Sequence, residues 1–336
     1  MPARNQNPRG GSFDLGQLRG TSIADCSHLV LKYGMVLPKA MGNLRLTVAL
    51  LFVCLFVESN GVAQTMEPFS VERLRVAPGY DDGLSLQLPT TINAGEFHAR
   101  LLFAYQDDPL VLLNASTSAR VGAPIHQRVS GDLVLGYGIH DRVNLYAQLP
   151  TTLWQDGDTV SISKSGAGDL SIGAKLRLVG NREGFAVGLT VALVEPTGKV
   201  AAFNSDNQVA GRTTLSLAYS KARWRVGANV GADLRAKRQY YDYTTGSDLT
   251  FAAGASFDPL KPLRLGAELF GTTRFDKDLF FRNSAYTHLE TAGVLTVMPS
   301  ERWAVRAGGS LGILRAVGTP TYRFLDLAFR LGLRSP

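Results

Sequence analysis

Residues Gly168 to Leu178 read GDLSIGAKLRL and alternate strictly between apolar and polar side chains. Successive side chains of a β-strand point to opposite faces of the sheet. The stretch therefore predicts a strand with one aliphatic face, which includes Ile172 and Leu176, and a second face that carries Lys175 and Arg177. The apolar face requires a non-aqueous neighbour, either lipid or a protein core.

The same alternation returns along the rest of the chain. Twelve segments show it, and they cover about 97–105, 133–139, 143–149, 170–178, 185–193, 215–219, 224–234, 249–257, 263–269, 289–297, 303–311 and 325–333. Segments of about ten residues with a period of two, separated by turns, are typical of a membrane-spanning β-barrel. Each segment alone is weak evidence, but twelve in agreement are much stronger.

The connections between these segments alternate in length. Short turns are predicted at 140–141, 181–183, 220–222, 258–262 and 299–301, and long loops at about 106–127, 155–167, 195–207, 236–247, 275–285 and 315–321. Outer-membrane barrels have short periplasmic turns and longer extracellular loops. The pattern thus places both ends of the predicted barrel in the periplasm.

The alternative is a soluble barrel or sandwich with an apolar core, which periodicity alone does not exclude. The polar faces, however, are rich in Gly, Ser and Thr rather than densely charged, and five aromatic residues fall at strand ends, namely Tyr105, Tyr137, Trp224, Phe257 and Trp303. Aromatic residues in such positions form the interfacial girdles of membrane barrels. The predicted fold class is all-β: a single closed antiparallel transmembrane barrel of about 12 strands over residues 95–336, in the bacterial outer membrane.

Residues 1–64 are predicted to be a leader. Within them an apolar run at about 46–57 is followed by a small-residue site at 61–63, the layout of a signal peptide. The run is too short for a transmembrane helix, which needs roughly 20 residues. The start codon is expected at Met35 or Met41, an extended leader being the alternative. Both cysteines would be lost with the leader, and Cys54 lacks the preceding small residues typical of a lipidated cysteine.

Residues 65–94 precede the first predicted strand and contain Pro68, Pro78 and Pro89, which argue against a long regular element. They either fold into the lumen as a plug or form a periplasmic tail. The sequence slightly favours the tail.

The polar faces of the predicted strands define candidate lumen-lining residues. They are Arg100, Asp132, Lys175, Arg177, Arg225, Asp233, Arg235, Arg264, Glu268, Glu290, Arg306, Asp326 and Arg330, with Asp169, Arg274 and Arg334 on the same faces. Basic side chains exceed acidic ones in this set, which favours a narrow pore with a mild preference for anions. The other interpretation, that these charges pair across a lumen filled by its own side chains, has equal weight.

No catalytic, cofactor or metal site is predicted, and the chain is not expected to be an enzyme. The outer-membrane phospholipases place a Ser two residues after a His, whereas here Arg100 follows His98 and Glu290 follows His288. His140 and Asp141 fall in a tight turn, where Asp is common for conformational reasons. Without the leader the chain has 29 basic and 25 acidic residues, a balance too small to indicate nucleic-acid binding.

Several motifs resemble known barrel families. GAGDLSIGAKLRL (166–178) and LVEPTG (193–198) are similar to a proteobacterial barrel family described by the MetA pathway of phenol degradation. PFSVERLRVAPG (68–79), DDPLVL (107–112) and VGTPTYRFLDLAFRLGL (317–333) resemble the N-terminal barrel of myxobacterial OmpA-family proteins. These resemblances imply an outer-membrane barrel. Related barrels are sometimes joined to a peptidoglycan-binding domain, which is not expected here.

The predicted function is a passive channel or transporter for small solutes, with hydrophobic or aromatic solutes implied by the family resemblance alone. The alternative is a non-conducting structural or adhesive barrel, whose loops, such as Tyr240–Tyr243, meet external partners. The expected partners are outer-membrane lipid, the barrel assembly machinery and a small-molecule solute.

Overall fold

A computed structural model describes residues 69–114, 120–158, 162–240, 243–276, 280–281, 286–314 and 321–332. The predicted leader and both cysteines lie outside these residues. The barrel strands are β1 (Glu96–Leu113), β2 (Arg120–His140), β3 (Val143–Asp156), β5 (Leu170–Gly180), β6 (Gly184–Glu195), β7 (Ala210–Lys221), β8 (Trp224–Leu234), β11 (Asp248–Leu260), β12 (Leu263–Arg274), β13 (Thr287–Ser300), β14 (Trp303–Leu314) and β15 (Thr321–Gly332).

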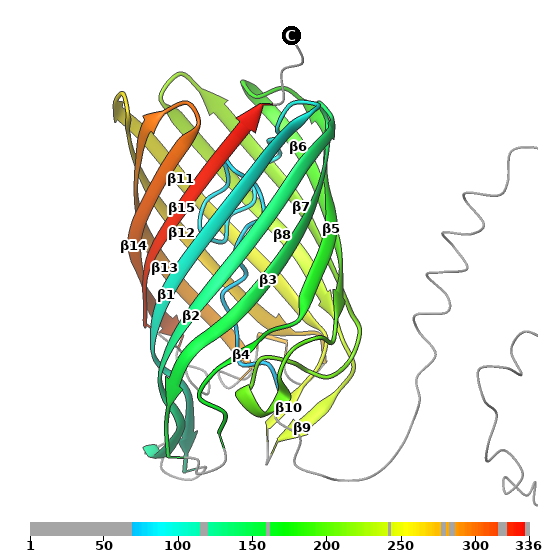
Figure 1. Cartoon of the computed structure of the whole chain (residues 1–336), viewed down its shortest axis with the longest axis vertical. Helices are drawn as coiled ribbons and strands as arrows, with labels where there is room; N and C mark the ends of the chain where they lie inside the picture. Colours follow the sequence, from blue (N-terminus) through cyan, green and yellow to red (C-terminus); the bar gives the residue numbers. More distant parts are fainter. Residues whose placement is uncertain are drawn as a thin grey trace, which may run out of the picture. The chain divides into compact units, whose positions relative to one another are not determined.

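Each barrel strand pairs antiparallel with two neighbours, and the sheet closes between the first and last strands (Figure 1). Leu101 of β1 lies opposite Leu133 of β2 on one side and Leu327 of β15 on the other. Closure pairs the backbone of every strand on both edges, which a sheet in lipid requires. The prediction of a closed, 12-stranded antiparallel barrel is confirmed.

Short additional elements lie among the connections at the long-loop end of the barrel. They are β4 (Gly166–Ala167), which pairs with β3, the short helix η2 (Val200–Ala202), and the hairpin of β9 (Arg238–Tyr240) and β10 (Tyr243–Thr245). Among the described residues, no helix is long and apolar enough to cross a membrane.

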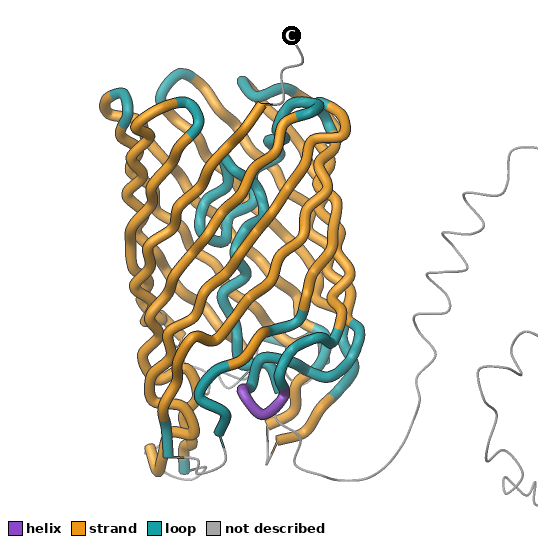
Figure 2. The backbone as a smooth tube through the Cα atoms, in the orientation of Figure 1, coloured by secondary structure: helices purple, strands orange, loops and turns teal. Residues whose placement is uncertain are grey.

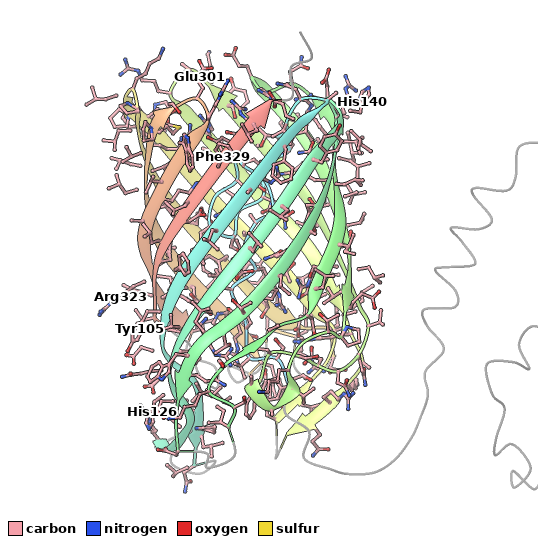
Figure 3. All side chains as sticks on the ribbon, viewed as in Figure 1. Tyr105, His126, His140, Glu301, Arg323 and Phe329 are labelled. Atoms are coloured by element: carbon pink, nitrogen blue, oxygen red, sulfur yellow. The ribbon has the colours of Figure 1, made fainter. Side chains whose placement is uncertain are left out.

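The loop predicted at 106–127 is wrong for most of its length, because β1 continues to Leu113 and β2 begins at Arg120. The sequence there breaks the alternation with Asp107, Asp108 and Pro109. Register shifts between β1 and β2 accommodate this break in the alternation, and Asp108 adopts a positive φ of 52°. The two strands therefore extend as a bulged ribbon toward the end where Figure 3 labels His126.

The outer face of the barrel is apolar, as the alternation predicted. In β5, Ile172 is 54% exposed and Lys175 is 2% exposed, so the two faces of the opening stretch point out of and into the barrel respectively. Near the short turns, Trp224 stacks obliquely on Phe257 and Trp303 on Phe329, with ring centroids 4.5 and 4.6 Å apart. These pairs form part of an aromatic girdle at the short-turn end.

Residues 69–94 run through the lumen from the long-loop end to the short-turn end, where β1 begins (Figures 1 and 2). We refer to them as the inner segment. Phe69 packs on Phe203 and Tyr243 at the long-loop end, and Ala94 donates to the side chain of Asp141 in the turn after β2. The preference for a periplasmic tail is therefore corrected. The prolines that disfavour a regular element are compatible with an irregular chain inside the barrel.

Candidate functional site

The inner segment shares an apolar core with the lumen wall. Leu74, Val76, Leu84, Leu86 and Leu88 are buried. They pack against inward-facing residues of the barrel, which are Leu102, Ala104, Ala218, Ala252, Phe270, Ala292, Val294, Tyr322 and Phe324. Burying an aliphatic side chain of this size contributes about 1.5–3 kcal/mol. Apolar side chains of the inner segment and the wall thus fill this part of the lumen, and charged residues lie on either side of them.

Two guanidinium groups and one carboxylate hold the turn of the inner segment. Arg100 Nε and Arg306 Nη1 donate to the same oxygen of Asp326, over 2.8 and 3.0 Å. The remaining donors point to the inner segment: Arg100 donates to the carbonyl oxygens of Ala77 (2.7 Å) and Gly83 (2.9 Å). Arg306 donates to the carbonyl oxygen of Tyr80. Three predicted lumen residues therefore form one network with the segment.

Glu268 of β12 receives three backbone N–H groups of the inner segment. The donors are Leu84 at 2.7 Å and Ser85 and Leu86, both at 2.9 Å. The approach is close enough that a Cβ atom on Gly83 would collide with the Glu268 carboxylate. Hydrogen bonds to a charged acceptor are stronger than neutral ones, and this carboxylate fixes the path of three consecutive residues.

Lys175 of β5 contacts Asp82, with 2.5 Å between Nζ and Oδ1, and both side chains are almost fully buried. Asp82 also accepts from the backbone of Gly79 (2.6 Å) and Leu88 (2.9 Å). The carboxylate closes a turn of the inner segment while the lysine ties that turn to the wall. Lys175 is therefore an anchor for the segment rather than a free lumen cation.

At the long-loop end, Asp233 of β8 pairs with Arg75 of the inner segment, with 2.9 Å between Oδ2 and Nε. Arg235 pairs with Asp206 (3.0 Å) and Asp248 (2.7 Å). The inner segment is thus tied to the wall at this end also.

The remaining predicted lumen residues contact partners in the wall or the turns. Asp132 accepts from Gln148, and Glu290 accepts from His288 and Ser310. Arg225 and Arg264 share Asp258, while Arg177 and Arg330 donate to the turn carbonyls of Asp141 and Glu301. Arg274 pairs with Asp276, Asp169 accepts from Gly198, and Arg334 lies outside the described residues.

Several residues of this network were missed from the sequence. Asp82 and Arg75 lie in the segment that the prolines marked as irregular, and Arg212 lies in β7 just before the predicted strand 215–219. One available signal was the alternation of Leu84, Leu86 and Leu88 with polar residues, which is a strand-like period within the segment.

Two cavities lie beside the inner segment. The larger, which is partly open to solvent, is on the long-loop side and is lined by Arg75, Tyr146, Thr190, Arg212 and Asp233 among others. The smaller is on the short-turn side and includes Arg225, Arg264 and Arg306 in its lining. The barrel side of each cavity carries both polar and apolar side chains, and the apolar contact of the inner segment lies between the two cavities.

The apolar exterior, the closed sheet and the aromatic girdle define an outer-membrane β-barrel. Residues 110–308 match the family described as "Putative MetA-pathway of phenol degradation", and the chain belongs to this family. No curated protein matches the sequence.

One of the solved structures found by comparison shares the fold. An outer membrane channel from Pseudomonas putida F1, of the COG4313 group, has a TM-score of 0.58 at 16% identity, over 72% of this chain and 98% of that one. The NanC porin gives 0.48 at 9% identity, over 69% and 100%. The KdgM porin gives 0.44 at 10% identity, over 69% and 98%.

Proposed function

We propose that this protein is an outer-membrane channel for small solutes, in which the inner segment forms the constriction. The observation that carries the proposal is the pair of cavities in the lumen, one on each side of the apolar contact that the inner segment makes with the barrel wall. The fold shared with an outer membrane channel supports it. Outer-membrane lipid and the barrel assembly machinery are its expected partners.

The solutes that fit the lumen are small and partly apolar. The larger cavity combines guanidinium and hydroxyl groups with apolar side chains such as Leu74, Val76 and Phe270. The family description, which refers to phenol degradation, supports hydrophobic or aromatic solutes. A general preference for anions is weaker than the sequence suggested, because Arg100, Lys175, Arg235 and Arg306 all contact carboxylates.

A second candidate function is a non-conducting structural or adhesive barrel, as the resemblance to OmpA-type barrels suggests. The observation that favours it is the filling of the lumen by buried ion pairs and apolar contacts of the inner segment. Part of the tip at Tyr240–Tyr243, which was the candidate adhesive loop, lies outside the described residues.

Planar-bilayer conductance of the protein, expressed as the full chain and purified from outer membranes, separates the two candidates. A channel gives discrete steps, and Lys175→Glu raises their size or frequency because it places two carboxylates together and loosens the inner segment. Lys221→Glu, in an exposed position at the end of β7, is the matched control and leaves the steps unchanged. If neither the wild type nor Lys175→Glu produces steps or admits solute in liposome swelling, the structural barrel is the better description.

A further inference from the structure

The larger cavity contains an arginine whose guanidinium makes only long contacts with neighbouring side chains. Arg212 projects from β7 into this cavity. Within the described chain, its contacts are long: 3.7 Å from Nε to Asp233 Oδ2 and 3.4 Å from Nη1 to Ser171 Oγ. The first exceeds hydrogen-bond distance, because Asp233 makes its short contact, at 2.9 Å, with Arg75. The guanidinium therefore has N–H groups available to donate hydrogen bonds to a ligand in the cavity.

A buried hydroxyl group lies on the adjacent strand. Thr190 of β6 is 4% exposed, lines the same cavity, and its Oγ1 has no hydrogen-bond partner in the described part of the chain. It lies opposite Thr214 of β7, which is two residues from Arg212 and therefore on the same face. A buried hydroxyl group without a partner costs free energy unless a ligand or water satisfies it.

The rest of the cavity wall is partly apolar. Leu74 and Val76 of the inner segment, Ala192 and Val194 of β6, and Phe270 of β12 all line it. Carboxylates also line the cavity, and of these Asp233 and Asp206 are paired with Arg75 and Arg235. A ligand that fits therefore has an apolar body and a charged end complementary to the guanidinium of Arg212. Carboxylates match the planar fork of arginine donors.

We propose that the larger cavity is a binding site for a small organic monocarboxylate, with the carboxylate on Arg212 and Thr190 and the apolar body against Leu74, Val76 and Phe270. The inference deepens the proposed channel function by naming a substrate class. The binding site itself does not depend on that function, but a role for the site in transport does. The ligand lies between the barrel wall and the inner segment, so an occupied site is next to the constriction.

Isothermal titration of the detergent-solubilised full protein with benzoate tests the site, with benzamide as the uncharged molecule of similar shape. Benzoate is expected to bind and benzamide to bind at least roughly tenfold more weakly, since a charged hydrogen bond is lost. Arg212→Gln is expected to weaken benzoate binding by roughly tenfold or more, and Thr190→Val by a smaller factor. Arg223→Gln, at the exposed turn after the same strand, is the matched control and binds benzoate as the wild type does.

The proposal is overturned if benzoate fails to bind the wild type, if benzamide binds equally well, or if folded Arg212→Gln retains full affinity. Folding of each variant is checked by its heat-modifiable mobility in SDS gels. If Arg212→Gln does not fold, the comparison of benzoate with benzamide binding to the wild type still tests whether the site recognises a carboxylate. Benzoate binding without conductance removes the channel function but keeps the site, whereas conductance without binding removes the site alone.

Discussion

At the scale of single residues, several of the lumen charges act as anchors for the inner segment. Glu268 illustrates this, because its two oxygens receive three consecutive backbone N–H groups that would otherwise be buried without partners. The sequence identified Glu268 as inward-facing from its position in the alternation. It gave no indication of the partner, since the three donors are more than 180 residues away in the chain.

We predict that Glu268→Gln loosens the inner segment without opening the barrel. The amide keeps one acceptor oxygen but loses the charge, so the contacts to Leu84, Ser85 and Leu86 weaken by about 1.5–3 kcal/mol. Hydrogen exchange followed by mass spectrometry should show faster exchange at residues 84–86 and unchanged exchange in β12. Glu301→Gln, in an exposed turn, is the control. Unchanged protection at residues 84–86 would show that the apolar contacts alone hold the segment.

A second residue-scale prediction concerns pH at the long-loop end. The pKa of Asp158 is held below its usual range by the hydrogen bond from the backbone N–H of Ala123 and then by that from His126. A carboxylate with a lowered folded pKa contributes stability that is complete above its unfolded pKa of about 3.9 and is lost as the pH falls through the folded pKa.

The protection factor of the Ala123 amide should therefore fall as the pH drops below about 4. In Asp158→Ala the protection should be low at every pH, because the acceptor is missing, whereas Asp156→Ala should behave as the wild type. Exchange measured by NMR in detergent micelles tests this. A protection factor that is independent of pH in the wild type would contradict the assigned contact.

At the scale of elements, strand β5 shows what alternation does and does not decide. The outward face is correct, with Ile172 exposed to lipid and Lys175 directed inward. The alternation does not reveal what Lys175 contacts inside the barrel. The structure places it against Asp82, so Lys175→Glu would change the packing of the inner segment as well as the lumen charge, because the variant brings two buried carboxylates together.

We predict that Ile172→Lys impairs assembly of the barrel. A lysine on the lipid face costs about 2–4 kcal/mol near the bilayer midplane and less toward either interface. Ile172→Val, which retains an apolar side chain, is the control. The fraction of heat-modifiable protein in outer membranes measures assembly, and wild-type levels of Ile172→Lys would show that this face does not contact lipid.

At the scale of the whole molecule, stability in the membrane depends on closure between β1 and β15. Leu327 of β15 lies between Leu101 and Val305, so its strand has no free edge. A proline there removes a backbone N–H and leaves a carbonyl oxygen unpaired in a region without water. The cost would fall on closure of the sheet, because β15 is the strand that joins β14 to β1.

Leu327→Pro should therefore abolish the folded, fast-migrating band in unboiled SDS gels, whereas Leu327→Ala should retain it. The alanine variant loses apolar area at the same position but keeps the N–H group, so the comparison isolates the backbone effect. Folding of both variants to the same extent would show that this part of the sheet tolerates a missing bond.

The sequence by itself determined the barrel. A period of two, repeated twelve times with alternating short and long connections, fixes the strands, their facing and their number, since each strand needs one face for lipid and one for the lumen. It misjudged the length of β1 and β2, because Asp107, Asp108 and Pro109 break the alternation while the register shifts keep the strands paired.

Only the tertiary structure decided the state of the lumen. Whether Asp82 meets Lys175, or Arg75 meets Asp233, depends on contacts between residues far apart in the chain, and no local period encodes them. The inner segment has too irregular a pattern to be recognised alone. Its position is set by the barrel around it. Burial of its apolar side chains lowers the free energy of the folded state, and its buried charges require partners that the barrel wall supplies.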